Sequence, residues 1–242
     1  MKIIDIHSHI LPYVDDGAKD IEQAINMLKI ACSEGIRKII ATPHYHIGRM
    51  MANKAKCEES IVLLRKKIEE LGLELELYLG NEIYYHTEAM EKVNAKSVMS
   101  MADSSYVLFE FSPSVDISTI YKGINDAIME GYVPIIAHFE RYNCLADKIK
   151  KCEELVGMGA LLQVNASSVL GEHGIRTKKY IKKLMKKNLI SFVASDAHED
   201  VHRVPKLKEC YLYVQKKFGE DYARKIFYDN QNELINDGRI VV

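Results

Sequence analysis

The strongest constraint on this chain is a regular alternation of short apolar segments with stretches whose apolar residues recur at helical spacing. Seven segments have the length and apolar character of buried strands, and they lie at residues 3–9, 36–41, 73–79, 106–109, 133–137, 161–164 and 190–194. Such alternation predicts βα units and a parallel sheet. We therefore expect an α/β fold, and because no linker divides the 242 residues, a single domain over 1–242.

The expected helices have recognisable ends. The helix that starts near Ile21 is preceded by Asp20, which with Gln23 resembles a capping box, and Gly35 is suited to stop it. Helical spacing predicts further helices over 61–71, 117–129, 147–156 and 177–187, and amphipathic helices fill the chain after residue 198.

Nearly every predicted strand ends in a histidine or a carboxylate. In the first strand, His7 and His9 are one residue apart, so an extended chain presents both imidazoles on the same side. In a (β/α) barrel, the C-terminal strand ends converge on the face that holds the active site. Groups distant in sequence would be neighbours there, and they are His7, His9, Asp16, His44, Glu82, Glu110, His138, Asp196 and His198.

Each of these residues taken alone has an ordinary alternative role. Asp16 precedes Gly17 and could be a turn residue or a helix cap. Glu82 and Glu110 could be exposed charges, and His44 could be a loop histidine. Taken together, nine such groups on one face would leave charge unsatisfied without cations. Imidazoles and carboxylates without cysteine suit Mn²⁺, Fe, Zn²⁺ or Mg²⁺, and their number favours two or three metals.

Two arginines closely follow candidate ligands. Arg141 comes shortly after His138, and Arg203 shortly after His198. Metals would repel an arginine unless an anionic substrate lay between them, and a guanidinium matches phosphate oxygens bidentately. The alternative is a surface salt bridge to a neighbouring glutamate, and phosphate binding is the favoured interpretation.

Composition excludes several classes of function. The 33 basic and 34 acidic residues nearly balance, so no global field favours nucleic acid. We find neither a signal peptide nor an apolar run of about 18 residues, so we expect a cytoplasmic protein without membrane insertion. The five cysteines are scattered and are interpreted as reduced thiols. None is followed by five residues and an arginine, so phosphate ester chemistry would not use a thiolate.

In their order along the chain, these motifs resemble the PHP superfamily, named for polymerase and histidinol phosphatase. The motifs are Asp5-Ile6-His7-Ser8-His9, Asp15-Asp16-Gly17, Thr42-Pro43-His44, Gly80-Asn81-Glu82, Glu110, Ala137-His138-Phe139-Glu140-Arg141 and Ser195-Asp196-Ala197-His198. Over essentially its full length, the chain is similar to the metal-dependent PHP-type protein-tyrosine phosphatases of bacterial capsule and exopolysaccharide loci, the CpsB type. The resemblance implies a distorted TIM-like (β/α)7 barrel.

The resemblance also implies three divalent metals, usually Mn²⁺, with Fe, Zn²⁺, Mg²⁺ or Co²⁺ as alternatives. The first metal would be held by His7, His9, Glu82 and Asp196. Glu82 would bridge to a second metal, completed by Glu110 and His138. The third would be bound by His44 and His198, with Asp16 as a ligand or support; which of Asp15 and Asp16 has this role stays open. Arg141 and Arg203 match the family's phosphate-binding arginines.

The implied activity is hydrolysis of phosphotyrosine by a hydroxide between metals, with Arg141, Arg203 and Asp16 as catalytic residues. The implied partner is a phosphotyrosine-bearing protein, the bacterial tyrosine kinase of the same polysaccharide locus. The alternative is a PHP-type small-molecule phosphatase such as histidinol phosphatase, which would use the same metals in a closed pocket. The oligomeric state stays open.

Overall fold

The computed structural model describes residues 1–241, apart from the side chains at positions 50 and 51. Its strands are β1 (Ile3–Ser8), β2 (Ile36–Ala41), β3 (His44–His46), β4 (Met50–Met51), β5 (Glu76–Leu79), β6 (Glu82–Tyr84), β7 (Tyr106–Glu110), β8 (Val133–Ile136), β9 (Leu161–Asn165) and β10 (Phe192–Ala194). β3 and β4 pair antiparallel, and the other pairings between these named strands are parallel. The predicted α/β fold with a parallel sheet is confirmed.

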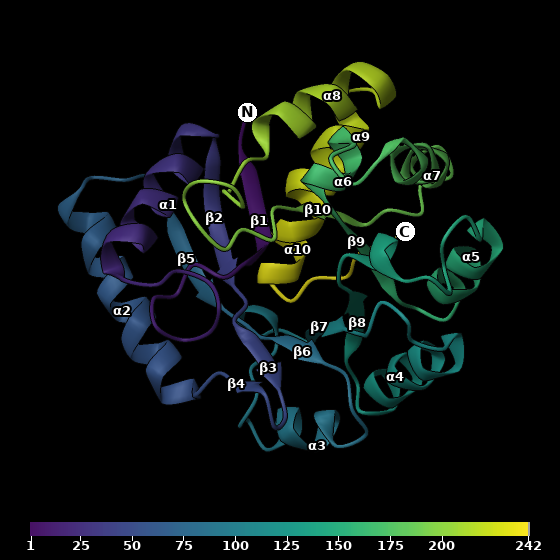
Figure 1. The fold of residues 1–242 in the computed structure, drawn as a ribbon, viewed down its shortest axis with the longest axis horizontal. Coiled ribbons are helices and arrows are strands. Elements are labelled where there is room, and N and C mark those ends of the chain that lie inside the picture. Colours follow the sequence, from purple (N-terminus) through teal and green to yellow (C-terminus); the bar gives the residue numbers. More distant parts are fainter. Residues whose placement is uncertain (242) are drawn as a thin grey trace.

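The strands form two sheets, ordered β1-β2-β5 and β10-β9-β8-β7-β6-β3-β4. β1 lies beside the end of β10, because Ser8 forms a parallel bridge with Ala197 and the His9 N–H donates to the Ala197 carbonyl at 2.7 Å. This contact joins the two sheets, so that the strands follow one another around a distorted TIM-like barrel (Figure 1).

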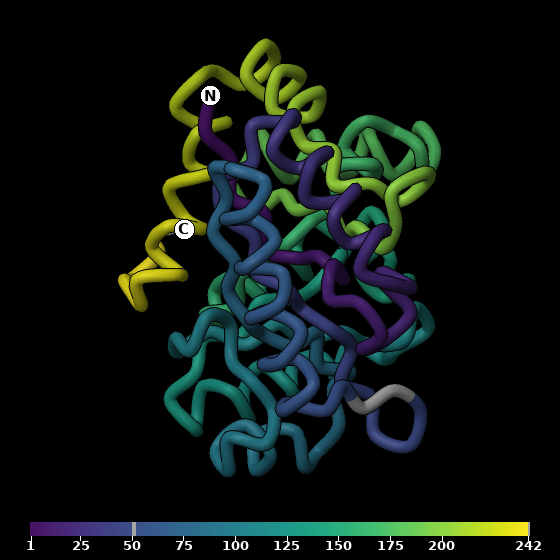
Figure 2. Tube along the Cα trace, turned by 90° about the vertical axis from the view of Figure 1, so that its left-hand side faces the viewer, coloured from purple at the N-terminus to yellow at the C-terminus, as the bar shows by residue number. Residues whose placement is uncertain are grey.

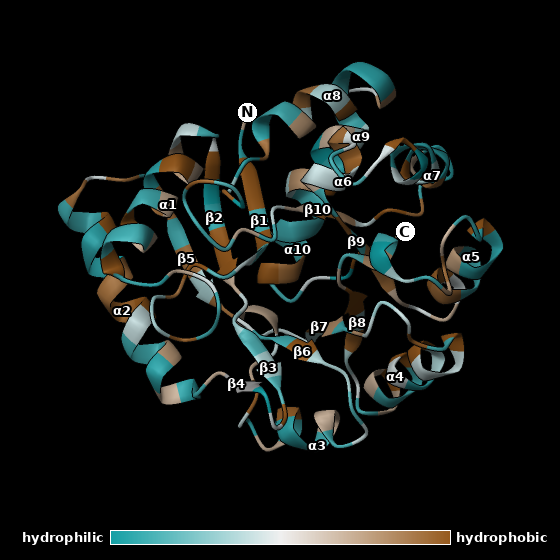
Figure 3. Cartoon of the chain, in the orientation of Figure 1, coloured by the Kyte–Doolittle hydropathy of each residue, from teal (hydrophilic) through white to brown (hydrophobic). Residues whose placement is uncertain are grey.

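Helices surround the strands (Figure 1). The outer helices are α1 (Ile21–Ser33), α2 (Lys54–Glu70), α3 (Ala89–Asn94), α4 (Ile117–Met129), α5 (Ile149–Gly157), α7 (Ile175–Met185) and α8 (Lys208–Phe218). The shorter elements are η1 (Met101–Asp103), η2 (Phe139–Arg141), α6 (Ala166–Leu170), α9 (Glu220–Arg224), the π-helical η3 (Lys225–Asp229) and α10 (Asn230–Ile235). Figure 3 shows β1 and β2 as largely hydrophobic, whereas the helices around them carry many hydrophilic residues. Within residues 1–241, none of the helices has both the length and the apolar character that crossing a bilayer requires.

The barrel interior is filled by strand side chains and is closed at one end by the C-terminal helix. Ile4, Leu108, Ile135 and Phe192 belong to one fully buried cluster, and Leu234 of α10 packs into it. Figure 2 shows the C-terminal segment on one side of the strands and the loop after β1 on the other. This apolar cluster therefore lies at the N-terminal ends of the strands. The C-terminal ends are left available for polar groups.

The predicted helix ends are confirmed for α1. The Asp20 carboxylate accepts a hydrogen bond from the Gln23 N–H at 2.8 Å, and Gly35, with φ +85°, follows the helix. The second predicted helix is longer than expected and begins at Lys54, because the Asn53 side chain caps it by accepting from the Lys56 N–H.

The structure adds a further short strand at each of two candidate ligands. His44 and Glu82 follow β2 and β5, as expected, and they also begin β3 and β6. The chain is interrupted at Pro43, which has no N–H to donate, and at the residues between β5 and β6. It then pairs again, with His44 opposite Glu82. At two positions around the barrel, the chain therefore forms two successive short strands, β2 then β3 and β5 then β6. β3 and β6 extend the barrel beyond the candidate ligands.

Candidate metal centre

The side chains of His7 and His9 reach the barrel interior because β1 contains a bulge. Ile4 and Ile6 point into the interior cluster, so strict alternation would turn His7 away from it. The register with β2 shifts between Asp5 and Ser8, where β1 has one residue more than its partner. A bulge of this kind resets the alternation and re-aims the following side chains. Both histidines are fully buried.

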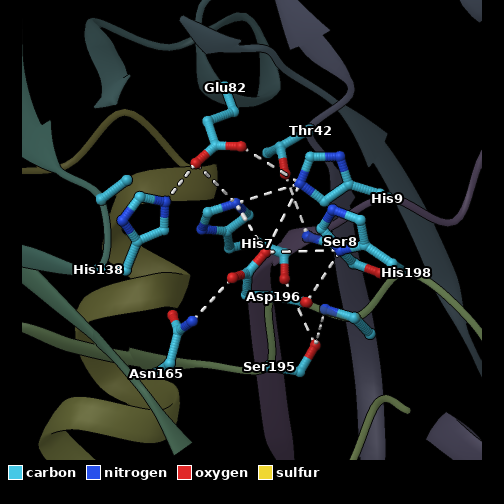
Figure 4. Close-up of polar contacts among 12 residues, drawn as sticks. His7, Ser8, His9, Thr42, Glu82, His138, Asn165, Ser195, Asp196 and His198 are labelled. Atoms are coloured by element: carbon cyan, nitrogen blue, oxygen red, sulfur yellow. Dashed lines mark hydrogen bonds and ion pairs between the residues drawn. The ribbon is translucent and has the colours of Figure 1, made fainter. Parts of the chain in front are cut away.

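Glu82 is the centre of the site. Its carboxylate lies 2.8 Å from His138 Nε2 and 3.0 Å from His44 Nδ1. It also lies 3.3 Å from Nε2 of both His7 and His9. Figure 4 shows the imidazoles of His138, His7 and His9 arranged around this carboxylate, with Asp196 on the side opposite Glu82. One buried carboxylate therefore faces four imidazoles that come from three different parts of the chain.

Potential ligand atoms gather in three overlapping sets, within each of which all atoms lie within 4.8 Å of one another. The sets are His7–His9–Glu82, His44–Glu82–Glu110 and His9–Asp16–His44–His198. Glu82 is shared by two sets, as the bridging role predicted for it requires. The grouping differs from the expected one because His9 and His44 each belong to two sets. His138 lies beside the second set, with Nε2 3.7 Å from the Glu110 carboxylate.

Asp15 and Asp16 have different environments. Asp15 is buried, and its carboxylate accepts hydrogen bonds from His9 Nδ1 at 2.7 Å, the His44 N–H at 2.9 Å and the Gly17 N–H at 3.0 Å. Asp16 is 52% exposed, and its carboxylate lies 3.4 Å from His44 Nε2 and 3.7 Å from His198 Nε2. Asp15 therefore orients a histidine, whereas Asp16 presents its oxygen to the candidate ligands.

Both arginines converge on Asp196. Arg141 Nη2 lies 2.9 Å from one carboxylate oxygen, and Arg203 Nη2 lies 3.0 Å from the other. The two guanidinium side chains are 33% and 46% exposed, whereas Asp196 is 3% exposed. The structure therefore pairs both arginines with a candidate ligand rather than with the neighbouring glutamates that were the alternative for them.

Several supporting residues were missed by sequence reasoning. Gln163 Oε1 lies 3.1 Å from His7 Nδ1 and accepts from the His138 N–H at 2.8 Å. Asn165 donates to the Asp196 carboxylate at 2.7 Å. The sequence did contain a signal for these two residues. Gln163 and Asn165 are polar, they alternate along an otherwise apolar strand, and they share a face with Leu161, which packs in the barrel interior.

Asp5 orients a neighbouring residue of the site. Its buried carboxylate accepts from the Ser195 N–H at 3.0 Å and the Ser195 hydroxyl at 2.5 Å. This pair fixes the residue before Asp196.

Asp196 and His138 both adopt positive φ, +55° and +28°. This conformation is uncommon for residues with side chains and is concentrated at functional sites.

The site holds opposite charges that perturb each other. Burial lowers the pKa of His9, but the Asp15 and Glu82 carboxylates outweigh this and raise that pKa well above its usual value. Burial raises the pKa of Glu82, yet the surrounding histidines bring it well below its usual range. His198 differs, since burial and the charge of His9 lower its pKa to about 3.

The donor set fits divalent cations. The buried Glu82 Oε2 atom has no hydrogen-bond partner among the described residues, although two imidazole nitrogens lie close to it. His7 Nε2 and His9 Nε2 face each other at 3.3 Å. Imidazole nitrogens and carboxylate oxygens turned toward one another in this way suit Mn²⁺, Fe²⁺ or Zn²⁺, and the buried carboxylates require a positive partner.

Known proteins resemble this chain over most of its length. The family model for capsular polysaccharide synthesis, CpsB/CapC, matches residues 3–236. The chain belongs to the CpsB/CapC family. This CpsB/CapC chain is 35% identical to tyrosine-protein phosphatase CpsB of Streptococcus pneumoniae over 240 residues, which cover 97% of this chain and 99% of the relative. It is 34% identical to tyrosine-protein phosphatase YwqE of Bacillus subtilis over 219 residues, covering 90% and 86% of the two chains.

Solved structures agree with the family assignment. A crystal structure from a study of YwqE from Bacillus subtilis and CpsB from Streptococcus pneumoniae, described as unique metal-dependent tyrosine phosphatases, matches with a TM-score of 0.92 at 32% identity. The match covers 99% of this CpsB/CapC chain and 96% of that one. Histidinol phosphate phosphatase from Lactococcus lactis matches with a TM-score of 0.52 at 13% identity over 80% and 84% of the two chains, a likeness of fold alone.

Proposed function

We propose that this protein is a metal-dependent protein-tyrosine phosphatase. The observation that carries the proposal is the buried Glu82 carboxylate, which faces four imidazoles at 2.8–3.3 Å at the C-terminal end of the barrel. A carboxylate in that position can bridge two cations, and the full-length relatives are named tyrosine-protein phosphatases.

We further propose three divalent ions, most simply Mn²⁺, held by the three sets of ligand atoms. The residues would be the members of these sets, together with Asp196 and His138 beside them: His7, His9, Glu82, Glu110, His44, His198, Asp16, Asp196 and His138. Bound cations supply Lewis-acid stabilisation of phosphate and lower the pKa of water to about 7, so that water can serve as the nucleophile at neutral pH.

Arg141 and Arg203 act on the phosphate in this proposal. Both guanidinium groups are half-exposed and already converge on the Asp196 carboxylate. With cations bound beside Asp196, the arginines would be free to donate to the phosphate oxygens and to offset charge there. The leaving phenolate has an ordinary pKa near 10 and needs no strong general acid, and we assign none.

A thiolate does not fit this chemistry. The five cysteines are Cys32, Cys57, Cys144, Cys152 and Cys210. Cys57, Cys152 and Cys210 are buried. Burial raises the pKa of Cys57 to about 12 and that of Cys152 to about 11. Thiols of this kind stay protonated at neutral pH and are poor nucleophiles.

The substrate we propose is a phosphotyrosine on a protein, the tyrosine kinase of a polysaccharide locus in the cytoplasm. The side chains of Asp16 and Arg203 are 52% and 46% exposed, so the site is open on the side that carries them. An open site admits a peptide segment, whereas histidinol phosphate would be selected by a closed pocket.

The test uses a phosphotyrosine peptide and histidinol phosphate as substrates. Purified protein is stripped with a chelator and reloaded with Mn²⁺, beside a Glu82→Gln variant and a Glu153→Gln control. Glu153 is an exposed residue of α5 that pairs with Lys187 at 2.8 Å. We expect peptide hydrolysis to stop with chelator and return with Mn²⁺, and Glu82→Gln to lose activity at least about 100-fold while the control is unchanged.

Three results would contradict the proposal. Peptide turnover unaffected by the chelator would exclude metal dependence. Wild-type turnover in Glu82→Gln would remove Glu82 from the centre of the site. Faster turnover of histidinol phosphate than of the peptide would favour the small-molecule alternative.

A further inference from the structure

Two aromatic rings stack beside the proposed metal centre and have no part in holding it. His46 of β3 and Tyr84 of β6 have ring centroids 4.0 Å apart and ring planes within 5° of parallel. Both side chains are partly exposed, in contrast to the neighbouring Ile83, which is fully buried. Each ring covers one face of the other, so the pair presents its outer ring faces and ring edges, and we call this pair the His46–Tyr84 shelf.

The strand register places this shelf next to candidate ligands. Side chains two residues apart on a strand share a face, so His46 follows His44 and Tyr84 follows Glu82 on the same side. The intervening Tyr45 and Ile83 point the other way and pack in the outer core. Across the pairing of β6 with β7, Tyr84 lies opposite Glu110.

The shelf exists because β3 and β6 continue past their candidate ligands. Each strand rises about 3.3 Å per residue, so the two rings lie roughly 6–7 Å beyond His44 and Glu82 along the strands. The P–O–C link of an aryl phosphate is shorter than this offset, and the width of the phenyl ring spans the rest. A phosphate held at the His44–Glu82–Glu110 set would have its phenyl ring beside the shelf.

We infer that the His46–Tyr84 shelf contacts the aromatic ring of the phosphotyrosine side chain and selects aryl over alkyl phosphate esters. This inference rests on the proposed phosphatase function and deepens it, because the metals and arginines recognise any phosphate and cannot distinguish tyrosine from serine. Aromatic rings prefer offset-stacked or edge-to-face contact with one another, and Tyr84 offers its ring without a charge to desolvate.

A second place for the ring exists on the other side of the site. A cavity of about 480 Å³ is lined by Arg141 and Arg203, with Leu170 as an apolar wall. Its remaining lining is largely polar and charged, including Glu172, Asn165 and Lys206. A phenyl ring would have to displace water from these groups without replacing their hydrogen bonds, so the shelf is the better partner for it.

The test measures binding, so that it does not depend on turnover. Benzylphosphonate and methylphosphonate present the same anion with and without a ring, and neither has a scissile phosphate ester. Their affinities for the Mn²⁺-loaded protein are measured by calorimetry for the wild type, Tyr84→Leu, Tyr84→Phe, His46→Leu and Leu170→Ala. Tyr13→Leu is the matched control, because Tyr13 is 71% exposed in the loop after β1. Manganese content is measured for every protein.

We expect the wild type to prefer benzylphosphonate. Tyr84→Leu should reduce that preference by roughly three- to tenfold, the effect of losing one aromatic contact, with unchanged methylphosphonate affinity and manganese content. Tyr84→Phe and Tyr13→Leu should keep the preference, and His46→Leu should reduce it. An unchanged preference in Tyr84→Leu would overturn the inference, and a loss confined to Leu170→Ala would place the ring in the cavity instead.

These outcomes are separable from failure of the phosphatase proposal. If the protein binds the phosphonates with the expected ring preference but does not hydrolyse phosphotyrosine peptides, the shelf inference is supported and the phosphatase proposal is contradicted. If the protein hydrolyses the peptides but shows no ring preference in binding, the phosphatase proposal is supported and the shelf inference is contradicted.

Discussion

Replacing Asp15 by Asn should weaken the site although Asp15 belongs to none of the three sets of candidate ligands. Its carboxylate receives three hydrogen bonds, from His9 Nδ1, the His44 N–H and the Gly17 N–H, and both oxygens are used as acceptors. An asparagine has one acceptor oxygen and one NH₂ group, so in either orientation a donor would face a donor. The amide is therefore not a conservative replacement at this position.

The magnitude follows from the electrostatics of Asp15. Burial raises the pKa of this carboxyl, but His9 and the hydrogen bonds outweigh burial and lower the pKa from 3.8 to about 2. A depressed carboxyl pKa stabilises the folded state above the unfolded pKa, and this stabilisation is lost as the pH falls from about 4 to about 2. We expect Asp15→Asn to lower the free energy of unfolding at pH 7 by about 2 kcal/mol.

Metal binding should suffer as well. A group that orients a metal-binding histidine typically contributes about ten- to a hundredfold to metal affinity. Chelator-stripped Asp15→Asn should therefore bind Mn²⁺ that much more weakly by calorimetry, and urea unfolding of the metal-free protein should report the lost stability. Asp16→Asn is the contrast, since its exposed carboxylate contributes little to metal-free stability but presents an oxygen to the third set.

One pattern of results would refute this reasoning. If Asp15→Asn matched the wild type in both measurements while Asp16→Asn lost the stability of the metal-free protein, the roles of the two aspartates would be reversed. A stability difference that grew, rather than shrank, as the pH fell from 4 toward 2 would show that the charge of Asp15 is not its source.

Three further outcomes are expected. Gly17→Ala should destabilise the protein and lower its metal content, because a Cβ there collides with the His9 carbonyl and Cβ; wild-type metal content and unfolding midpoint would contradict this. Iodoacetamide at pH 7.5 should leave phosphatase activity intact, since burial raises the pKa of Cys57 to about 12; proportional loss of activity with alkylation would argue for a thiolate. Apparent Mn²⁺ affinity should rise with pH, because the carboxylates that face His9 and His44 raise their pKa values, so that metal must displace their protons; calorimetry at pH 6 and pH 8 checks the sign.

The alternation of strands and helices was readable from sequence because burial on both faces gives parallel strands continuous apolar runs. The gathering of the nine candidate side chains followed from one rule, that strand ends in a barrel converge. The interruptions before β3 and β6 were not predictable in the same way, since short strands such as His44–His46 consist of polar residues whose pairing depends on their neighbours.

The geometry within the site needed the structure. Strict alternation from Ile4 and Ile6 would have placed His7 on the wrong face, and only the register shift in β1 shows how it reaches the interior. The adjacent Asp15 and Asp16 look alike in sequence, yet one is buried beneath His9 and the other lies open to solvent. Burial and hydrogen bonding decide that difference, and both are set by residues far along the chain.

The central claim is that divalent cations lie among these side chains. Anomalous diffraction at the manganese edge, from crystals of the Mn²⁺-loaded protein, tests it most directly. The account predicts peaks enclosed by the His7–His9–Glu82, His44–Glu82–Glu110 and His9–Asp16–His44–His198 sets. Manganese peaks elsewhere on the protein, with none beside Glu82, would contradict it.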